Sequence, residues 1–299
     1  MKKQFLFAAF LFAFIALPAI QPVAASAQSS INWTTAIHYA KLVKIAEGVD
    51  PTADYSAADK QSISALGYTY LQTVYGSDLS TDVDPDAGDT VSYGFLARSS
   101  SGELVAILRG TDTVLEWIDD AQFYFVSNPI SHSDGFTEEG FTAIYKSLRT
   151  GKSSSSQTLI KAIKSYLTAG TATSVTVSGH SLGGALANLL TLDIAHNSTL
   201  KTPVVYSFAS PRVGEYFFKS DYNDTVSSSY RVFNSKDLVP DIPEWPYEQV
   251  KAGFKLVANS SQVTSTIACE HHLTTYLWLM GQAAGVDAGS LDSDCVAGN

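Results

Sequence analysis

One short motif, together with the residues on either side of it, constrains the fold of this chain more than any other feature. Residues 179–183 read Gly-His-Ser-Leu-Gly, after a β-branched run at 174–178 and before a helix-forming run at 185–192. A serine in a sharp turn between a strand and a helix has its hydroxyl exposed at the end of the sheet. The flanking glycines lack a Cβ, so strand and helix can approach closely around the turn. We therefore interpret Ser181 as a nucleophile, the alternative being a glycine-rich turn with an idle serine.

Strands and helices alternate along most of the chain. Helices are predicted over 34–48, from 141 to 148, over 158–167 and over 273–283, with a further tyrosine-rich helical region within 53–75. Strands are predicted over 91–98 and 104–108, paired as a hairpin, and over 175–178, 204–209 and 230–234. Such alternation predicts an α/β fold with a mainly parallel central sheet and helices on both faces.

The first 27 residues have the pattern of a secretory signal peptide. Lys2 and Lys3 precede an apolar run over 5–20, and the small residues Ala25-Ser26-Ala27 follow it. Cleavage before Gln28 leaves one domain over 28–299, of about 272 residues. We therefore expect a secreted, extracellular or periplasmic protein; the alternative for this segment is a membrane anchor. No later stretch has ~18 or more uninterrupted apolar residues, so we expect no transmembrane anchor after cleavage.

Charge and cysteine content limit the partners and the compartment. The net charge is −10, and removal of Lys2 and Lys3 makes it about −12. This charge disfavours nucleic acid and anionic membranes as electrostatic partners. The two cysteines, Cys269 and Cys295, predict one disulfide in an oxidising compartment, the alternative being two free thiols. Asn-x-Ser/Thr glycosylation sites, which become glycans only in a host that glycosylates, occur at Asn32, Asn197, Asn223 and Asn259.

A nucleophilic serine needs a histidine to accept its proton and an acid to orient that histidine. On an α/β-hydrolase sheet the chain order is serine, acid, histidine. Only His271 and His272 follow Ser181 at a distance that leaves room for an acid. Asp237 lies just past a predicted strand, on the sheet edge expected for the nucleophile, with Asp241 as its competitor. The sequence therefore predicts a triad of Ser181, Asp237 and one of the two histidines.

An oxyanion hole requires two backbone N–H donors. The residue after the nucleophile, Leu182, is expected to supply one. Thr111 is expected to supply the other, because Arg109-Gly110-Thr111 closes the predicted strand 104–108. The alternative for Arg109-Gly110-Thr111 is an ordinary turn at a strand end.

Taken in order, these segments resemble the class 3 lipases, a family typified by secreted fungal triacylglycerol lipases. The resemblance covers about residues 90–285 and is carried by 109–111, Gly140-Phe141 with Tyr145, 179–184, 208–214, 237–240, and 270–273 with Tyr276. It implies an α/β-hydrolase fold and ester hydrolysis without a metal or another cofactor. The chain departs from the family pattern at Leu108, Glu138 and Ala209, where Phe, His and Gly are common.

The histidine and the lid are further expectations from this resemblance. His271 fits the His-x-Leu-x-x-Tyr spacing of many relatives, and His272 fits the shorter His-Leu form of the fungal enzymes; we prefer His271. In the family the segment after the oxyanion strand forms a lid. Here residues 113–125 are amphipathic, with Leu115, Trp117 and Ile118 among the apolar side chains. The alternative is a helix packed permanently on the core.

We therefore expect a secreted serine carboxylester hydrolase, foremost a triacylglycerol lipase that takes its lipid or other ester substrate at an oil–water interface. A feruloyl or other small-ester esterase without a working lid is one alternative, and a phospholipase is another. A catalytically silent binding protein that kept the fold is the alternative from outside the enzymes.

Overall fold

The computed structural model describes residues 30–77, 90–110 and 123–298. The chain divides into two units, Met1–Ser30 and Ile31–Asn299, and every helix and strand below lies in the second. The expected signal peptide at residues 1–27 lies outside the described residues.

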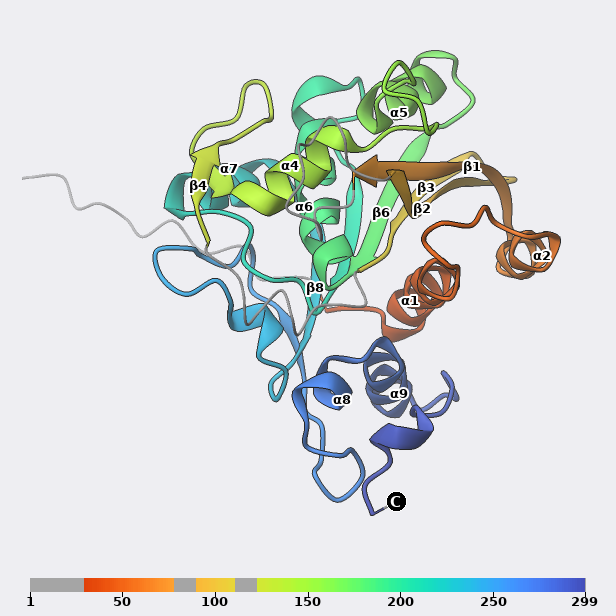
Figure 1. Ribbon diagram of the computed structural model, residues 1–299, viewed down its shortest axis with the longest axis vertical. Coiled ribbons are helices and arrows are strands. Elements are labelled where there is room, and N and C mark those ends of the chain that lie inside the picture. The colour runs from red at the N-terminus through yellow and green to blue at the C-terminus, as the bar shows by residue number, and fades with distance from the viewer. Residues whose placement is uncertain (1–29, 78–89, 111–122, 299) are drawn as a thin grey trace, which may run out of the picture. The chain divides into compact units, whose positions relative to one another are not determined.

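Among the described residues, seven strands form one sheet in the order β1-β2-β3-β6-β7-β8-β9 (Figure 1). The pairs β1–β2 and β2–β3 are antiparallel, and from β3 onward every pair is parallel. Their bounds are β1 Tyr68–Ser77, β2 Thr90–Ser99, β3 Glu103–Leu108, β6 Ser174–His180, β7 Val204–Phe208, β8 Ser228–Asn234 and β9 Phe254–Leu256. Two short strands, β4 Phe125–Ser127 and β5 Phe136–Glu138, form a separate pair.

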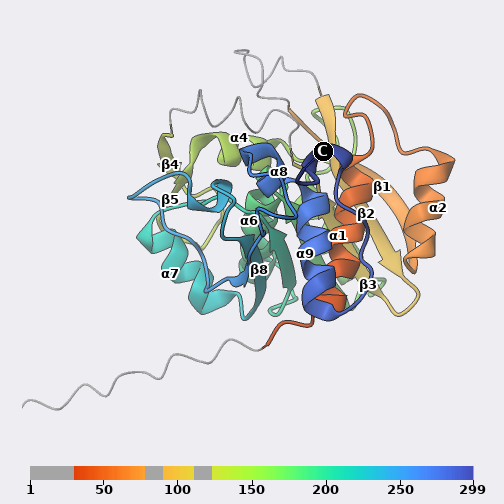
Figure 2. The ribbon, with the colours of Figure 1, turned by 90° about the horizontal axis from the view of Figure 1, so that it is seen from below.

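Helices cover both faces of the sheet, and each face has its own apolar core. One core joins the sheet to α4 Glu139–Ser147, α5 Leu159–Thr168, α6 Leu182–Asn197 and α7 Tyr216–Thr225. The other core joins it to α1 Trp33–Glu47 and α9 Leu273–Ala284, which lie side by side (Figure 2). The mainly parallel α/β architecture predicted from the sequence is therefore confirmed.

The central strand β6 and the helix α6 are buried almost throughout. A parallel strand covered on both faces needs apolar or small residues at consecutive positions, and β6 supplies them as Ser-Val-Thr-Val-Ser-Gly-His. α6 is apolar on all sides because it packs against the sheet and against α4, α5 and α7. The turn between β6 and α6 is thereby fixed in the middle of the molecule.

The sequence predicts a tyrosine-bearing helical region within 53–75, and the structure has a helix there, but its tyrosines lie outside that helix. α2 spans only Ala57–Ala65, and Tyr68–Ser77 forms the edge strand β1. Gly67, with a φ of +90°, ends the helical stretch, because such a backbone favours glycine. The tyrosines that follow alternate with polar residues and pair with β2, which a half-buried strand permits.

The other predicted elements occur close to their predicted bounds, including the β2–β3 hairpin. The sequence did not predict β4, β5, α7, β9 or the short helix α8 Ile267–His271. Most of these elements are three to five residues long, too short for hydrophobic periodicity to reveal.

Candidate active site

Ser181 occupies a strained turn between β6 and α6. Its φ of 57° and ψ of −128° lie where non-glycine residues are rarely found. The two glycines of the turn are required by close backbone contacts. A Cβ at Gly179 would lie 2.1 Å from the carbonyl oxygen of Gly183, and one at Gly183 would lie 2.3 Å from that of Leu108. Backbone strain of this kind, typically about 1–3 kcal/mol, is held in place by such surroundings and marks functional positions.

The end of β3 lies against this turn. A Cβ at Gly110 would come within 3.1 Å of the Cβ of Ser181, so the strand end and the serine are close neighbours. Leu182 is the first residue of α6, where backbone N–H groups have no acceptor within the helix and carry the positive end of its dipole. The role of this N–H as an oxyanion donor therefore stays a prediction, and its place at the helix N-terminus is compatible with it. Thr111, the expected second donor, lies outside the described residues.

Asp237, which follows β8, is buried and accepts three hydrogen bonds. His271 Nδ1 lies 2.8 Å from its Oδ2, the hydroxyl of Tyr276 donates to Oδ2 at 2.7 Å, and the backbone N–H of Val239 donates to Oδ1 at 2.9 Å. Asp241 instead lies 3.5 Å from the guanidinium of Arg212, with a side chain that is 78% exposed. The structure therefore joins Asp237, and not Asp241, to a histidine.

His271, the last residue of α8, is the histidine that meets Asp237. A carboxylate only accepts, so His271 Nδ1 carries the proton of that hydrogen bond and Nε2 keeps a free electron pair. Nε2 is buried and has no hydrogen-bond partner in the described part of the chain. Burial lowers the pKa of His271, and the hydrogen bond and charge of Asp237 offset this only in part. His271 is therefore a neutral base with its acceptor atom free.

His272 has a different place in the structure. Its side chain is exposed, and its Nδ1 accepts a hydrogen bond from the backbone N–H of Thr274 at the start of α9. It caps a helix and makes no contact with Asp237, which favours His271 as the base.

Two buried residues, Tyr276 and Asn234, support Asp237, and the sequence analysis assigned neither a role in the site. Tyr276 donates its hydroxyl hydrogen to Asp237 and accepts a hydrogen bond from the backbone N–H of Asn234 at 2.9 Å. The Asn234 side chain donates to the carbonyl oxygen of Glu270 at 3.0 Å, which ties the end of β8 to α8. Tyr276 belongs to the segment that resembles the class 3 lipases, 270–273 with Tyr276, and this resemblance was the only feature of the sequence that pointed to a role for it.

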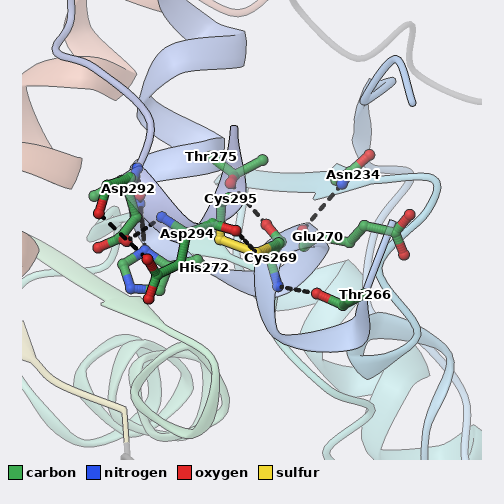
Figure 3. The surroundings of a disulfide bond; sticks show 11 residues. Asn234, Thr266, Cys269, Glu270, His272, Thr275, Asp292, Asp294 and Cys295 are labelled. Carbon is green, nitrogen blue, oxygen red and sulfur yellow. Dashed lines mark hydrogen bonds between the residues drawn. A yellow bond between two sulfur atoms is a disulfide. The ribbon is translucent and has the colours of Figure 1, made fainter. Parts of the chain in front are cut away.

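A disulfide joins Cys269 to Cys295, as the sequence predicts, and closes a loop with a separation of 26 residues (Figure 3). Thr266 caps α8 by accepting a hydrogen bond from the backbone N–H of Cys269 at 3.2 Å. Cys269 lies two residues before His271 on the same short helix. The disulfide therefore anchors the element that carries the base.

The expected lid residues Leu115, Trp117 and Ile118 lie outside the described residues. At the end of the expected lid segment, Phe125 begins the strand β4, and its ring stacks on Tyr247 with a centroid distance of 4.2 Å. No cluster of three or more His, Cys, Asp or Glu in the described ranges could hold a metal ion. None of the described helices combines the length and apolarity needed to cross a bilayer.

The site combines a serine in the turn of residues 179–183, which we call the elbow, with a buried Asp–His pair and a helix N-terminus. This arrangement agrees with the comparison to protein families. The family model described as Lipase (class 3) matches residues 105–247. The chain belongs to the class 3 lipase family.

Curated relatives of this class 3 lipase family member include plant proteins. The chain is 30% identical over 247 residues to phospholipase A1-Ialpha2, chloroplastic, of Arabidopsis thaliana. The matched region covers 67% of this chain and 50% of that protein. The chain is also 30% identical over 223 residues to phospholipase A1-II 3 of Oryza sativa subsp. japonica, with 66% and 53% covered. The chain thus spans about half the length of the curated relatives it matches.

Solved lipase structures share the fold. The lipase from Rhizopus microsporus var. chinensis superposes with a TM-score of 0.58 at 22% identity, covering 78% of this chain and 75% of that one. Nonglycosylated LIP2 lipase of Yarrowia lipolytica gives a TM-score of 0.59 at 18% identity, covering 85% and 88%. These similarities establish the α/β-hydrolase fold.

Proposed function

We propose that this class 3 lipase family member is a carboxylic ester hydrolase that uses Ser181, His271 and Asp237. One observation carries the proposal: the imidazole that packs against the elbow is held by a buried carboxylate through Nδ1 and leaves Nε2 without a partner. His180, the residue before the serine, contacts His271 with ring centroids 4.7 Å apart, so the base and the elbow are in direct contact.

The reaction follows from these positions. Nε2 of His271 takes the proton of the Ser181 hydroxyl as Oγ attacks the ester carbonyl carbon, and Asp237 stabilises the imidazolium that forms. The N–H groups of Leu182 and Thr111 bind the oxyanion of the tetrahedral intermediate. The intermediate collapses, the C–O bond to the alcohol breaks, and the imidazolium gives its proton to the departing alcohol. Water then repeats the sequence on the acyl-enzyme and releases the acid.

The proposed substrates are acyl esters of glycerol lipids. Triacylglycerol is the first proposal, because the amphipathic segment 113–125 has the apolar side chains of a lid that opens at an oil–water interface. Phospholipid is the second, because the curated relatives are named phospholipase A1. Small feruloyl-type esters are the third, and they require no working lid.

The test is a substrate panel applied to the wild type and to Ser181→Ala. We expect the wild type to hydrolyse p-nitrophenyl esters together with emulsified triglyceride or phosphatidylcholine vesicles, and methyl ferulate slowly or not at all. Ser181→Ala should lower kcat by about 10³-fold or more while the circular dichroism spectrum is unchanged. Retention of more than about a tenth of wild-type kcat would show that the nucleophile lies elsewhere.

We also propose that the protein is secreted. The charged, apolar and small-residue pattern of residues 1–27 supports cleavage before Gln28. The disulfide between Cys269 and Cys295 supports an oxidising compartment. N-terminal sequencing of protein recovered from the culture medium tests this, and an intact Met1 on that protein would contradict it.

A further inference from the structure

Both ring nitrogens of His180 are engaged, although this histidine has no part in the triad. Nδ1 lies 2.9 Å from Oε1 of Glu47, the last residue of α1. Nε2 lies 2.8 Å from the backbone carbonyl oxygen of His271. The side chains of His180 and Glu47 are 7% and 23% exposed, so these contacts are largely shielded from water.

The two contacts determine where the protons lie. A carbonyl oxygen only accepts, so His180 Nε2 carries a hydrogen; an ionised carboxylate also only accepts, so Nδ1 would carry a second one. The alternative is a neutral His180 whose Nδ1 accepts a hydrogen bond from the carboxyl O–H of a protonated Glu47. Burial is the largest single influence and opposes charge on both groups, but their attraction and hydrogen bond, together with the other groups around them, outweigh it. The pKa of His180 is therefore raised and that of Glu47 is lowered. Both directions favour the imidazolium–carboxylate pair.

We propose that Glu47 and His180 form a positioning dyad that holds the main chain of His271, and with it the catalytic imidazole, against Ser181. This inference rests on the proposed function and names residues that act on the base without touching substrate. The dyad joins three elements that are distant in sequence: the end of α1, the elbow after β6, and α8.

The base needs such support because of its place at a helix end. α8 has only five residues, and His271 is its last, so its carbonyl oxygen has no partner further along the helix. The ring Nε2–H of His180 supplies that partner, and the imidazole rings of His180 and His271 pack at 35° to one another. Misplacement of a catalytic group by about 1 Å can cost about 10²-fold in rate, so a fixed His271 main chain matters for catalysis.

The dyad also affects the charge of the base. The titratable groups that face His180 are Glu47 from α1, His271 from α8, Tyr276 from α9 and Asp237 after β8. The charge of Arg109, at the end of β3, acts on Glu47. The positive charge of His180 lowers the pKa of His271, and the negative charge of Glu47, which raises it, is the smaller of the two contributions. The net effect of the dyad is thus to lower the pKa of His271, in the same direction as burial, which is the main cause of its lowered pKa.

Glu47→Gln removes the charge pair and preserves the hydrogen bonds. The glutamine amide can donate to Nδ1 of a neutral His180, whose Nε2–H still donates to His271. We expect plateau kcat to be largely retained and the acidic limb of the kcat/KM profile to move to higher pH, because the base loses its cationic neighbour. His180→Phe keeps a ring in place but removes both hydrogen bonds, and should lower kcat by about 10²-fold with little change in KM.

Asp221→Asn is the matched control. His196 Nε2 lies 3.0 Å from Asp221 Oδ2, so this variant removes the carboxylate of a second, partly buried histidine–carboxylate contact. His196 lies near the opposite end of the 16-residue α6 from Ser181. Asp221→Asn should leave both kcat and the pH profile unchanged. Equal shifts in Glu47→Gln and Asp221→Asn, or full kcat in a folded His180→Phe, would overturn the proposal.

A second measurement does not depend on activity. In ¹⁵N-histidine spectra recorded near the ordinary histidine pKa of about 6.5, His180 should show two protonated ring nitrogens in the wild type and only one in Glu47→Gln. A singly protonated His180 in the wild type would overturn the charged dyad, whether or not the protein hydrolyses esters. Failure of the wild type on every ester of the panel, with a doubly protonated His180, would reject the proposed function and leave the ion pair established but without its positioning role.

Discussion

The carboxylate of Asp237 receives hydrogen bonds from three donors on separate stretches of chain: Val239 just after it, His271 on α8 and Tyr276 on α9. A buried charge is tolerated only where such donors replace water. The same donors fix the orientation of the carboxylate, so the Nδ1–H of His271 has one defined hydrogen-bond acceptor. Orientation of the base is therefore a property of these few contacts.

Replacing each histidine separately tests which one is the base. His271→Ala should lower kcat by about 10³-fold or more, because it removes the imidazole bonded to Asp237. His272→Ala removes a helix cap and should cost about 0.5–2 kcal/mol of unfolding free energy with a far smaller loss of kcat. Ester hydrolysis by variants with matched circular dichroism gives the ranking. The reverse ranking would assign the base to His272.

The pH dependence of the wild type follows from the burial of His271. Only the neutral imidazole can accept the serine proton, and burial lowers the pKa at which it becomes charged. As pH falls, activity should therefore persist below the ordinary histidine pKa of about 6.5 before it is lost. The kcat/KM profile on a soluble p-nitrophenyl ester measures this. An acidic limb centred above that value would contradict a buried neutral base.

At the scale of elements, the elbow depends on the meeting of β6, α6 and the end of β3 without side chains between them. Gly179→Ala would place a Cβ 2.1 Å from a backbone oxygen, so strand and helix must separate. We expect a loss of about 3 kcal/mol or more in unfolding free energy. Gly48→Ala is the control, because its added Cβ has no backbone or side-chain atom closer than 3.4 Å and its φ of −78° suits any residue.

Urea unfolding of both glycine variants and the wild type checks this expectation. Gly48→Ala should change the unfolding free energy by less than about 1 kcal/mol. Similar midpoints for Gly179→Ala and the wild type would mean that the elbow is looser than the contacts imply.

The sequence predicted the elbow well because its signals are consecutive: a β-branched strand, two glycines and a helix former. Within 53–75 the helix was predicted but its tyrosines were wrongly assigned to it, because tyrosine suits both a helix face and an edge strand and only the pairing with β2 decides between them. The roles of Tyr276 and His180 could not be predicted, since their partners lie 39 and 133 residues away. The departure at Ala209 is informative, because its φ of 51° is a conformation that glycine adopts more readily.

At the scale of the whole molecule, the disulfide connects the region after α9 back to α8. In the chain-entropy model a loop of this size is worth roughly 3 kcal/mol. Reduction of the Cys269–Cys295 bond should therefore lower the melting temperature, and it should also lower activity, because α8 carries His271. Melting curves and hydrolysis rates before and after reduction measure both effects.

Alkylation and mass spectrometry of the unreduced protein provide the control for this experiment. Both cysteines should resist alkylation until a reductant is added. Reactive thiols on the native protein, or a reduced protein with unchanged melting temperature and activity, would contradict the anchoring role.

Glu47 belongs to the first helix of the described chain, His180 beside Ser181 to its middle, and His271 to α8 near its end. The contacts of His180 with Glu47 and His271 span 133 and 91 residues. Contacts between such distant segments form late, because the intervening loops must close first. During synthesis the elbow can emerge and fold well before α8 exists. Ester cleavage is thus reserved for the finished chain: a nascent or shortened polypeptide that already displays its serine has no base to activate it.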